Sequence, residues 1–312
     1  SPARPERSGS GATAESKGAT PTDLAAVRRR ATELQGEAED ALRRKDGPRA
    51  LALVKEIAKL GEGGDAAAIE LSRRIAGELN ADHRIGVSRY DFDKAMRSDE
   101  MIGVVKRALL DPSADPSFRG RAVEYLADSS NPDTTAFISS LIEQERDPRT
   151  LSQMVRYVEE VGDPGSVDAL SRALGGQQDR RLRGQIVDAL GEMPGDAASV
   201  ALQQVAASDP DEGLRRDAQL ALTARNPPVQ GYLLTRVVDQ SQAAAAGLRP
   251  GDIMLSYDGV TLGPESSIRD LRDRVSKNAT VPVTVWRDGQ TIQVTLNPGQ
   301  IGIDGKGVAP AR

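Results

Sequence analysis

An apolar stripe recurs at a nearly constant interval through the middle of the chain. Its starting positions are separated by 33, 31 and 32 residues, and apolar residues follow each of them four and seven positions later. This is the spacing of one face of an α-helix. Because a helix pair of this length cannot bury its apolar face alone, successive units must stack and share a core. The repeat therefore predicts an α-helical solenoid over residues 98–227, with starting positions Phe118, Leu151, Leu182 and Leu214.

An acidic or amide residue followed by proline marks where several of these helices begin. Asp115-Pro116, Asp147-Pro148 and Asp209-Pro210 precede three of the first helices, while Asn131-Pro132 and Asp163-Pro164 open two of the second helices. A capping side chain before a proline in the first turn is a preferred helix entry. With the period, these starts make the segment resemble HEAT repeats of the short bacterial type.

The resemblance to HEAT repeats implies a second surface for contacts with proteins. In such arrays the second helices line the concave side, and their outward residues here are expected to be small and mostly uncharged. An ordinary solvated surface fits these residues equally well. The expected outward residues are Ser139, Ser171, Gln203 and Gln204.

Two further segments precede the repeats. Residues 1–20 contain no aliphatic side chain larger than alanine, so they cannot offset the entropy of ordering and are expected to form a disordered tether. Residues 21–97 have helical periodicity with breaks at 46–48 and 61–64, which predicts helical hairpins. The sequence begins at Ser1 without a methionine. A signal peptide or membrane anchor upstream of residue 1 would fit, and so would a start chosen for expression.

The apolar period changes from 3.6 to 2 after Asn226–Pro228. Four strands are expected, joined in part by hairpin turns at Asp258-Gly259 and Asp288-Gly289, and one helix is expected over 266–278. The stretch "AAAAGLRPGDIMLSYDG", residues 243–259, makes this segment look like a PDZ domain of the bacterial kind. The resemblance covers about residues 229–303, and the domain is expected to span residues 229–308. The fold class expected for the whole chain is multidomain, with a HEAT-like solenoid followed by this small, mostly β domain.

The resemblance to PDZ domains implies a site for a peptide C-terminus. Such domains bind peptides by strand addition, and an aliphatic-Gly-aliphatic loop directs backbone N–H groups at the terminal carboxylate. In many bacterial members this loop and its pairing strand precede "GYLLTRVV", where this chain has repeat helix instead. "GQIGI", residues 299–303, has the loop pattern and follows the last expected strand. We therefore expect a circularly permuted arrangement, in which the carboxylate loop and the pairing strand come last.

The candidate peptide-binding residues come from this loop and from the 266–278 helix. Ile301 and Ile303 are expected to line the pocket for the last ligand side chain, and a small or aliphatic terminal residue should fit there. A structural turn without a ligand, and a groove blocked by the chain itself, remain alternatives. The full set is Gly299, Gln300, Ile301, Gly302, Ile303, Ile268, Arg272 and Val275.

Catalysis and metal binding are not expected. The chain has no cysteine and a single histidine, His83, which follows a helix and has no nucleophile motif beside it. We therefore expect a non-enzymatic protein without cofactors or a small-molecule substrate. The formal net charge of −5 argues against nucleic acid or an anionic membrane as a partner.

These features favour a non-catalytic adaptor or scaffold that binds a protein or peptide, most simply a free C-terminus. One alternative is a regulatory subunit of a protease or another envelope enzyme. A second is a structural scaffold whose PDZ groove is occupied by its own tail or a neighbouring copy. By resemblance to bacterial PDZ proteins we expect the cell envelope or periplasm, with a cytoplasmic location as the alternative.

Overall fold

The computed structural model describes residues 21–81, 84–128, 133–267, 269 and 280–310. The chain divides into two compact units, residues 1–128 and 129–312. The predicted tether, His83 and Asn131-Pro132 lie outside the described residues. Within those residues, no helix combines the length and apolar character needed to cross a bilayer.

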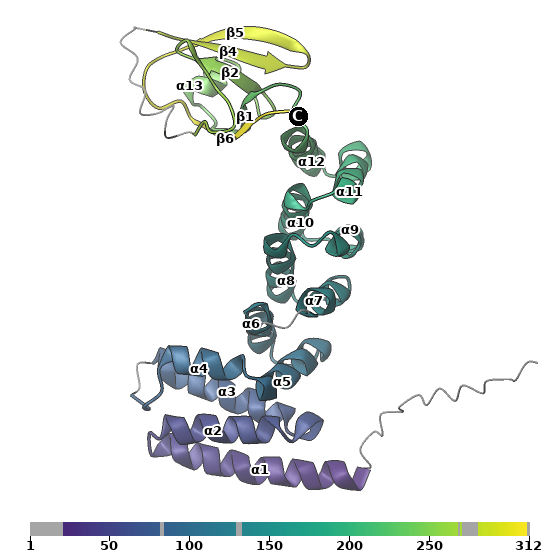
Figure 1. Cartoon of the computed structure of the whole chain (residues 1–312), viewed down its shortest axis with the longest axis vertical. Coiled ribbons are helices and arrows are strands. Elements are labelled where there is room, and N and C mark those ends of the chain that lie inside the picture. Colours follow the sequence, from purple (N-terminus) through teal and green to yellow (C-terminus); the bar gives the residue numbers. More distant parts are fainter. Residues whose placement is uncertain (1–20, 82–83, 129–132, 268, 270–279, 311–312) are drawn as a thin grey trace, which may run out of the picture. The chain divides into compact units, whose positions relative to one another are not determined.

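The first unit is built from antiparallel helix hairpins (Figure 1). Apolar side chains at helical spacing fill its core, and Leu53, Ile57 and Leu71 are fully buried. The break expected at 46–48 is present, because Asp46 accepts a hydrogen bond from the N–H of Arg49 and starts a new helix. The helices are α1 (Pro21–Arg43), α2 (Gly47–Ala58), η1 (Gly61–Gly63), α3 (Asp65–Asn80), α4 (Arg89–Met96), α5 (Asp99–Leu110) and α6 (Pro116–Ala127).

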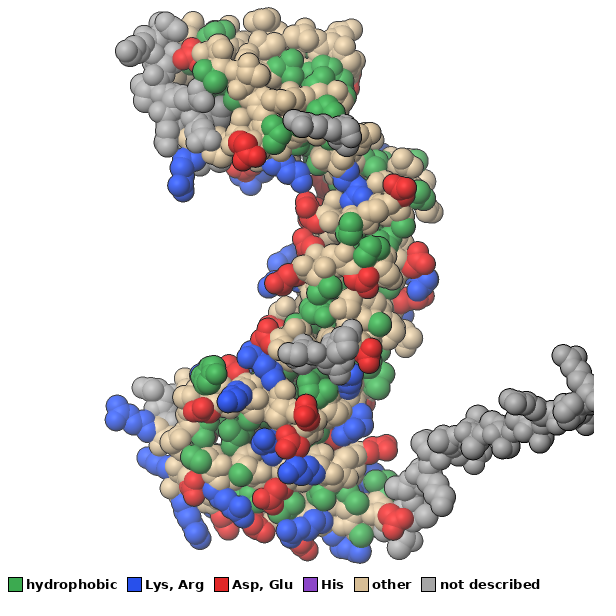
Figure 2. Space-filling view, in the orientation of Figure 1, with side chains coloured by type: hydrophobic (Ala, Val, Ile, Leu, Met, Phe, Trp, Pro, Cys, Tyr) green, Lys and Arg blue, Asp and Glu red, His purple; other side chains and the backbone are tan. Residues whose placement is uncertain are grey.

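Charged side chains of both signs cover these N-terminal helices. Figure 2 shows Lys and Arg interspersed with Asp and Glu, rather than gathered by sign. Several form exposed ion pairs, such as Arg73 with Glu70 at 2.9 Å and Arg74 with Glu39 at 2.8 Å. Exposed pairs of this kind contribute about 0–1 kcal/mol each, so the packed apolar face carries most of the stability of this unit.

The second unit begins with the remaining repeat helices, and the predicted stripe forms their core. Phe118 in the first unit and its counterparts Leu151, Leu182 and Leu214 in the second are all at most 6% exposed. The solenoid expected from the period is therefore confirmed. Its helices are α7 (Thr134–Ile142), α8 (Pro148–Val161), η2 (Pro164–Ser166), α9 (Val167–Gly176), α10 (Arg180–Glu192), α11 (Asp196–Ser208) and α12 (Glu212–Arg225).

The predicted Asp-Pro starts hold for two of the three first helices. Asp115 and Asp147 cap α6 and α8, each accepting a hydrogen bond from a backbone N–H three residues later. The prediction was wrong at Asp209-Pro210. Asp211 caps α12 instead, accepting from the N–H of Leu214 at 2.9 Å.

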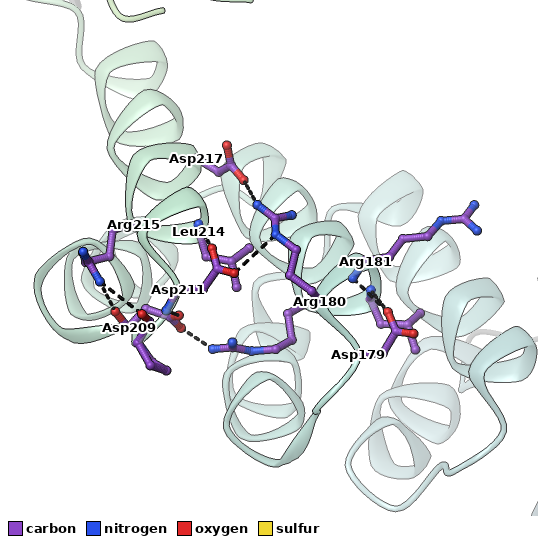
Figure 3. Close-up of polar contacts among 11 residues, drawn as sticks. Asp179, Arg180, Arg181, Asp209, Asp211, Leu214, Arg215 and Asp217 are labelled. Carbon is purple, nitrogen blue, oxygen red and sulfur yellow. Dashed lines mark hydrogen bonds and ion pairs between the residues drawn. The ribbon is translucent and has the colours of Figure 1, made fainter.

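Asp209 has a different role, as part of a polar cluster between repeats (Figure 3). Its carboxylate is almost fully buried and pairs with Arg183 of α10, while its carbonyl accepts from Arg215 Nη1 at 2.6 Å. Arg180, also on α10, pairs with Asp211, the cap of α12, and with Asp217 within α12. The acidic residue before Pro210 therefore links neighbouring repeats and does not start a helix.

The expectation for the outward residues of the second helices was wrong at Ser139. Its side chain is buried, and its hydroxyl lies 2.7 Å from the hydroxyl of Ser166 in the next repeat. Ser171 is partly exposed and donates to the carbonyl of Val167, and Gln203 and Gln204 are exposed. The two glutamines keep the expected position.

The C-terminal domain is an antiparallel sheet with the strand order β5-β4-β2-β1-β6, and β3 pairs with β2 (Figure 1). One face of the sheet carries the main core, which includes Tyr232, Leu234, Leu248 and Ile301. The opposite face carries a smaller cluster with Leu233 and Trp286. The strands are β1 (Gly231–Val237), β2 (Ile253–Tyr257), β3 (Val260–Thr261), β4 (Val281–Arg287), β5 (Gln290–Leu296) and β6 (Ile303–Val308).

The local features expected from "AAAAGLRPGDIMLSYDG" are present. A short helix, α13 (Gln242–Ala245), leads to Gly247 in the left-handed conformation, and Leu248 is buried. Asp252 is 2% exposed and is held by Arg287, whose Nε donates to it at 2.6 Å. Of the helix expected over 266–278, only Ser266, Ser267 and Arg269 are described, and Arg269 is helical.

Candidate functional site: the loop before β6 and the edge strand

The loop before β6 is held in place through its carbonyl groups. Gln300 accepts a hydrogen bond from Nε2 of Gln242 at 2.7 Å, and Ile301 accepts from the N–H of Ala243 at 3.2 Å. Gly302 accepts from the N–H of Val238 at 2.8 Å. All three donors lie at the end of β1 or on α13. The carbonyls of three successive loop residues are therefore satisfied within the domain.

The N–H groups of the same three residues differ from their carbonyls, because they have no hydrogen-bond partner among the described residues. Among the residues that the structure describes, none accepts a hydrogen bond from the backbone of Gln300, Ile301 or Gly302. Successive N–H groups without chain partners in a tight turn form an anion-binding nest. The loop can therefore offer three donors to an external carboxylate.

Two glycines give the loop its conformation. Gly299 and Gly302 have φ angles of 115° and 81°, a region that other residues rarely adopt. At Gly302 there is also no space for a side chain, because an added Cβ would lie 2.3 Å from Cβ of Ser241. Gly299 is thus favoured by its backbone angle alone, and Gly302 by both its backbone angle and close packing.

The loop borders a small open pocket of about 180 Å³, lined by Arg236, Val238 and the residues 300–304. Ile301 and Ile303 contribute to this lining, although their side chains are only 1% and 4% exposed and belong to the main core. The surface that they offer a ligand is therefore small. Their contact with a terminal ligand side chain stays a prediction. Ile268, Arg272 and Val275 lie outside the described residues.

Strand β6 forms an edge of the sheet, since among the described strands it pairs only with β1. Val237 on β1 lies opposite Ile303 on β6. The N–H of Val238 donates to the carbonyl of Gly302, so Val237 and Ile303 form a non-hydrogen-bonded pair. In such a pair the N–H and C=O groups of each residue point away from the partner strand. The main chain of Ile303 therefore faces the outer side of β6.

Gly305 also directs its main chain outward. Its partner on β1, Leu234, donates to the carbonyl of Asp252 and accepts from the N–H of Gly251, both at 2.8 Å and both on the β2 side. Leu234 therefore makes no ladder bond to Gly305. The carbonyl of Gly305 accepts a hydrogen bond from the hydroxyl of Tyr232 at 2.8 Å and keeps a second lone pair.

The structure adds site residues that sequence reasoning missed. Arg236 and Asp304 lie opposite each other on β1 and β6, 3.4 Å apart, and both line the pocket. Gln242 joins the two ends of the loop, since it accepts from the N–H of Asn297 at 2.7 Å and donates to Gln300. The pairing register brings these residues together, and no local sequence pattern encodes it.

The comparisons with known proteins match this architecture. The model for HEAT repeats matches residues 104–184 and 140–223, and the model for the PDZ domain matches residues 233–287. A solved structure of human deoxyhypusine hydroxylase has 15% identity and a TM-score of 0.35, over 65% of this chain and 84% of that one, which is too low to support a conclusion.

Similarity to curated proteins is confined to a short segment. A "Probable periplasmic serine endoprotease DegP-like" of Hahella chejuensis is 36% identical over 80 residues, which are 26% of this chain and 17% of that protein. "Magnetosome formation protease MamE" of Paramagnetospirillum magneticum is 33% identical over 86 residues, 27% of this chain and 12% of that protein. The chain thus spans less than a fifth of the length of these relatives.

The matching family models, the stacked helix pairs and the antiparallel sheet agree with one another. A PDZ domain is a protein-interaction module, so protein or peptide partners follow from the family. This chain contains HEAT repeats followed by a PDZ domain.

Proposed function

We propose that this protein is a non-catalytic adaptor whose PDZ domain binds the free C-terminus of a partner. The observation that carries the proposal is the loop at Gln300–Gly302, where three carbonyls are bonded internally and three N–H groups have no described acceptor. A terminal carboxylate placed on these donors would be followed by a ligand strand along the outer side of β6.

The repeats supply a second surface in this proposal. Gln203 and Gln204 are exposed on α11 and offer amide groups suited to contacts with another protein. A chain that binds one partner through the PDZ domain and another through the repeats would hold the two in proximity.

An accessory role beside a protease is the second candidate. It is favoured by the curated relatives, whose printed names describe proteases and, for the Hahella chejuensis protein, a periplasmic one. On the same basis we propose the cell envelope as the location. Addition of this protein to a candidate protease should then change the rate of peptide cleavage, whereas a simple adaptor should leave that rate unchanged.

The adaptor proposal is tested with two peptides of the same sequence that differ only in their C-terminal group, a carboxylate in one and a carboxamide in the other. Fluorescence anisotropy should show binding of a labelled peptide ending in valine with a free carboxylate, and at least tenfold weaker binding of the same peptide as a carboxamide. Equal affinities would contradict carboxylate recognition. No binding of either peptide would favour a scaffold with an occupied groove.

A further inference from the structure

The exposed face of β6 offers one charged side chain next to the carboxylate loop. Along the strand, Ile303 is buried in the main core, and Asp304 points to the opposite face with 58% of its side chain exposed. This alternation follows from the two-residue period of a strand. Asp304 is therefore the first side chain after the loop that a ligand could meet on that face.

The outward main chain fixes the register of an added strand. Ile303 and Gly305 both direct their N–H and C=O groups to the outer side, so a ligand strand would bond to these two residues. With its carboxylate on the loop, an antiparallel ligand places its last residue opposite Ile303 and its third-last residue opposite Gly305. Its next-to-last residue then lies opposite Asp304.

Residues directly opposite each other on antiparallel strands have their side chains on the same face, with Cβ atoms about 4.5–5.5 Å apart. The ligand's next-to-last side chain would therefore stand beside the carboxylate of Asp304. We infer that Asp304 selects a basic residue at the next-to-last position of the ligand. This inference rests on the proposed binding of a free C-terminus.

Arg236 does not remove this preference. It lies on β1, on the far side of Asp304 from the ligand, and the pair at 3.4 Å is more than half exposed on both sides, so it is weak. The ligand backbone would lie about two strand spacings, roughly 10 Å, from the backbone of Arg236. A ligand cation would approach Asp304 from the side away from Arg236, so its attraction to the nearer carboxylate outweighs its repulsion from the more distant, solvent-screened guanidinium.

Only a short part of β6 is accessible to a ligand strand, so the next-to-last ligand residue makes a large share of the contacts. At Gly307 an added Cβ would lie 2.2 Å from the carbonyl oxygen of Pro264, so that segment closes over the strand. Lys306, the next exposed side chain on the face of Asp304, already pairs with Glu192 at 3.2 Å. The ligand is thus read mainly over its last three residues.

The test uses the full chain and three labelled hexapeptides with free carboxylates. Each has four alanines followed by Lys-Val, Ala-Val or Glu-Val. Anisotropy should show the tightest binding for Lys-Val and the weakest for Glu-Val, each step changing the dissociation constant by about two- to fivefold, as expected for an opposite-charge or like-charge cross-strand pair.

Two variants and a control assign the effect to one side chain. Asp304→Asn should remove the ranking, and Asp304→Lys should invert it. Gln293→Lys, on the other edge strand β5, makes the same change in net charge as Asp304→Asn and should keep the ranking. Equal affinities for the three peptides with the unchanged protein would overturn the inference and leave carboxylate binding intact. Failure of all three to bind would overturn both.

Discussion

The N–H of Val238 donates to the carbonyl oxygen of Gly302 at 2.8 Å. This bond joins the end of β1 to the turn before β6 and directs the carbonyl of the loop into the domain. Two further bonds, from Gln242 and Ala243, do the same for Gln300 and Ile301. Among the described residues, no acceptor is found for the N–H groups of these three loop residues.

Gly302→Ala should abolish or strongly weaken binding of the free-carboxylate peptide. The substitution forces a side chain into a left-handed residue and against Ser241, so the loop must move. We expect at least about tenfold weaker binding, equivalent to 1.4 kcal/mol. Gly299→Ala is the matched comparison: its φ is also positive, so it shares the backbone strain, but an added Cβ meets no atom within 4 Å, and it should therefore weaken binding less than Gly302→Ala. If both variants bind like the unchanged protein, the loop is not the carboxylate site.

Gln242→Ala should weaken binding without unfolding the domain. The side chain bridges Asn297 and Gln300 across the loop, and its loss would leave the loop to be ordered by the ligand. A threefold to tenfold increase in the dissociation constant is expected, equivalent to about 0.7–1.4 kcal/mol, the range of one or two hydrogen bonds. Fluorescence of the sole tryptophan, Trp286, reports whether the domain remains folded. Unchanged affinity would show that the bridge does not organise the site.

Asp209→Ala should destabilise the repeats by about 3 kcal/mol. The change removes the partner of Arg183, which is 15% exposed and would be left as an uncompensated charge. Urea unfolding followed by circular dichroism measures the loss. Glu212→Gln is the control, because its pair with Arg216 is 72% exposed on both sides, and it should change stability by less than about 0.5 kcal/mol. Equal effects would mean that Asp209 has no special role between repeats.

Asp188→Asn should stabilise the protein at neutral pH. Partial desolvation, and then the charges of Asp217 and Glu192, raise the pKa of Asp188 above its usual value. Since a raised carboxyl pKa means that the folded state binds the proton more tightly, stability falls as pH rises from the unfolded pKa through the folded one. In Asp188→Asn no carboxyl ionises at this position, so its stability does not fall with pH for this reason. Asp188 and Glu192 are four apart on α10, where like charges cost about 0.2–0.5 kcal/mol, and a gain of that order is expected.

Thermal unfolding of the two proteins between pH 4 and pH 8 measures this difference. The curves should diverge as pH rises and converge toward the acid end. A constant difference across the range, or a variant that is less stable at neutral pH, would contradict the explanation.

The repeat and the PDZ fold could be predicted because each is encoded locally. The period of Phe118, Leu151, Leu182 and Leu214 is a property of the sequence alone, and so is the glycine pattern of residues 299–303. The permuted position of the last strand could be predicted because repeat helix, and not a glycine-containing loop and a strand, precedes Gly231. These features need no knowledge of which distant residues meet.

The remaining residues of the candidate site depend on strand register, and the contacts within the solenoid depend on packing between repeats. Arg236 and Asp304 are 68 positions apart in sequence and become neighbours only because β6 pairs with β1. The predictions for Asp209 and Ser139 were wrong because each side chain is buried against the adjacent repeat. Contacts between repeats cannot be predicted from the apolar pattern of one helix. The grouping of Glu159, Asp188 and Asp217 on successive repeat helices was missed for the same reason.

The most direct measurement of carboxylate binding follows the loop amides themselves. Nuclear magnetic resonance of the ¹⁵N-labelled protein should show the largest shifts at the N–H groups of Gln300, Ile301 and Gly302 when the free-carboxylate peptide ending in Lys-Val is added, and little change with its carboxamide. If these three signals stay in place while the peptide binds, or move equally with both peptides, the carboxylate does not dock on this loop.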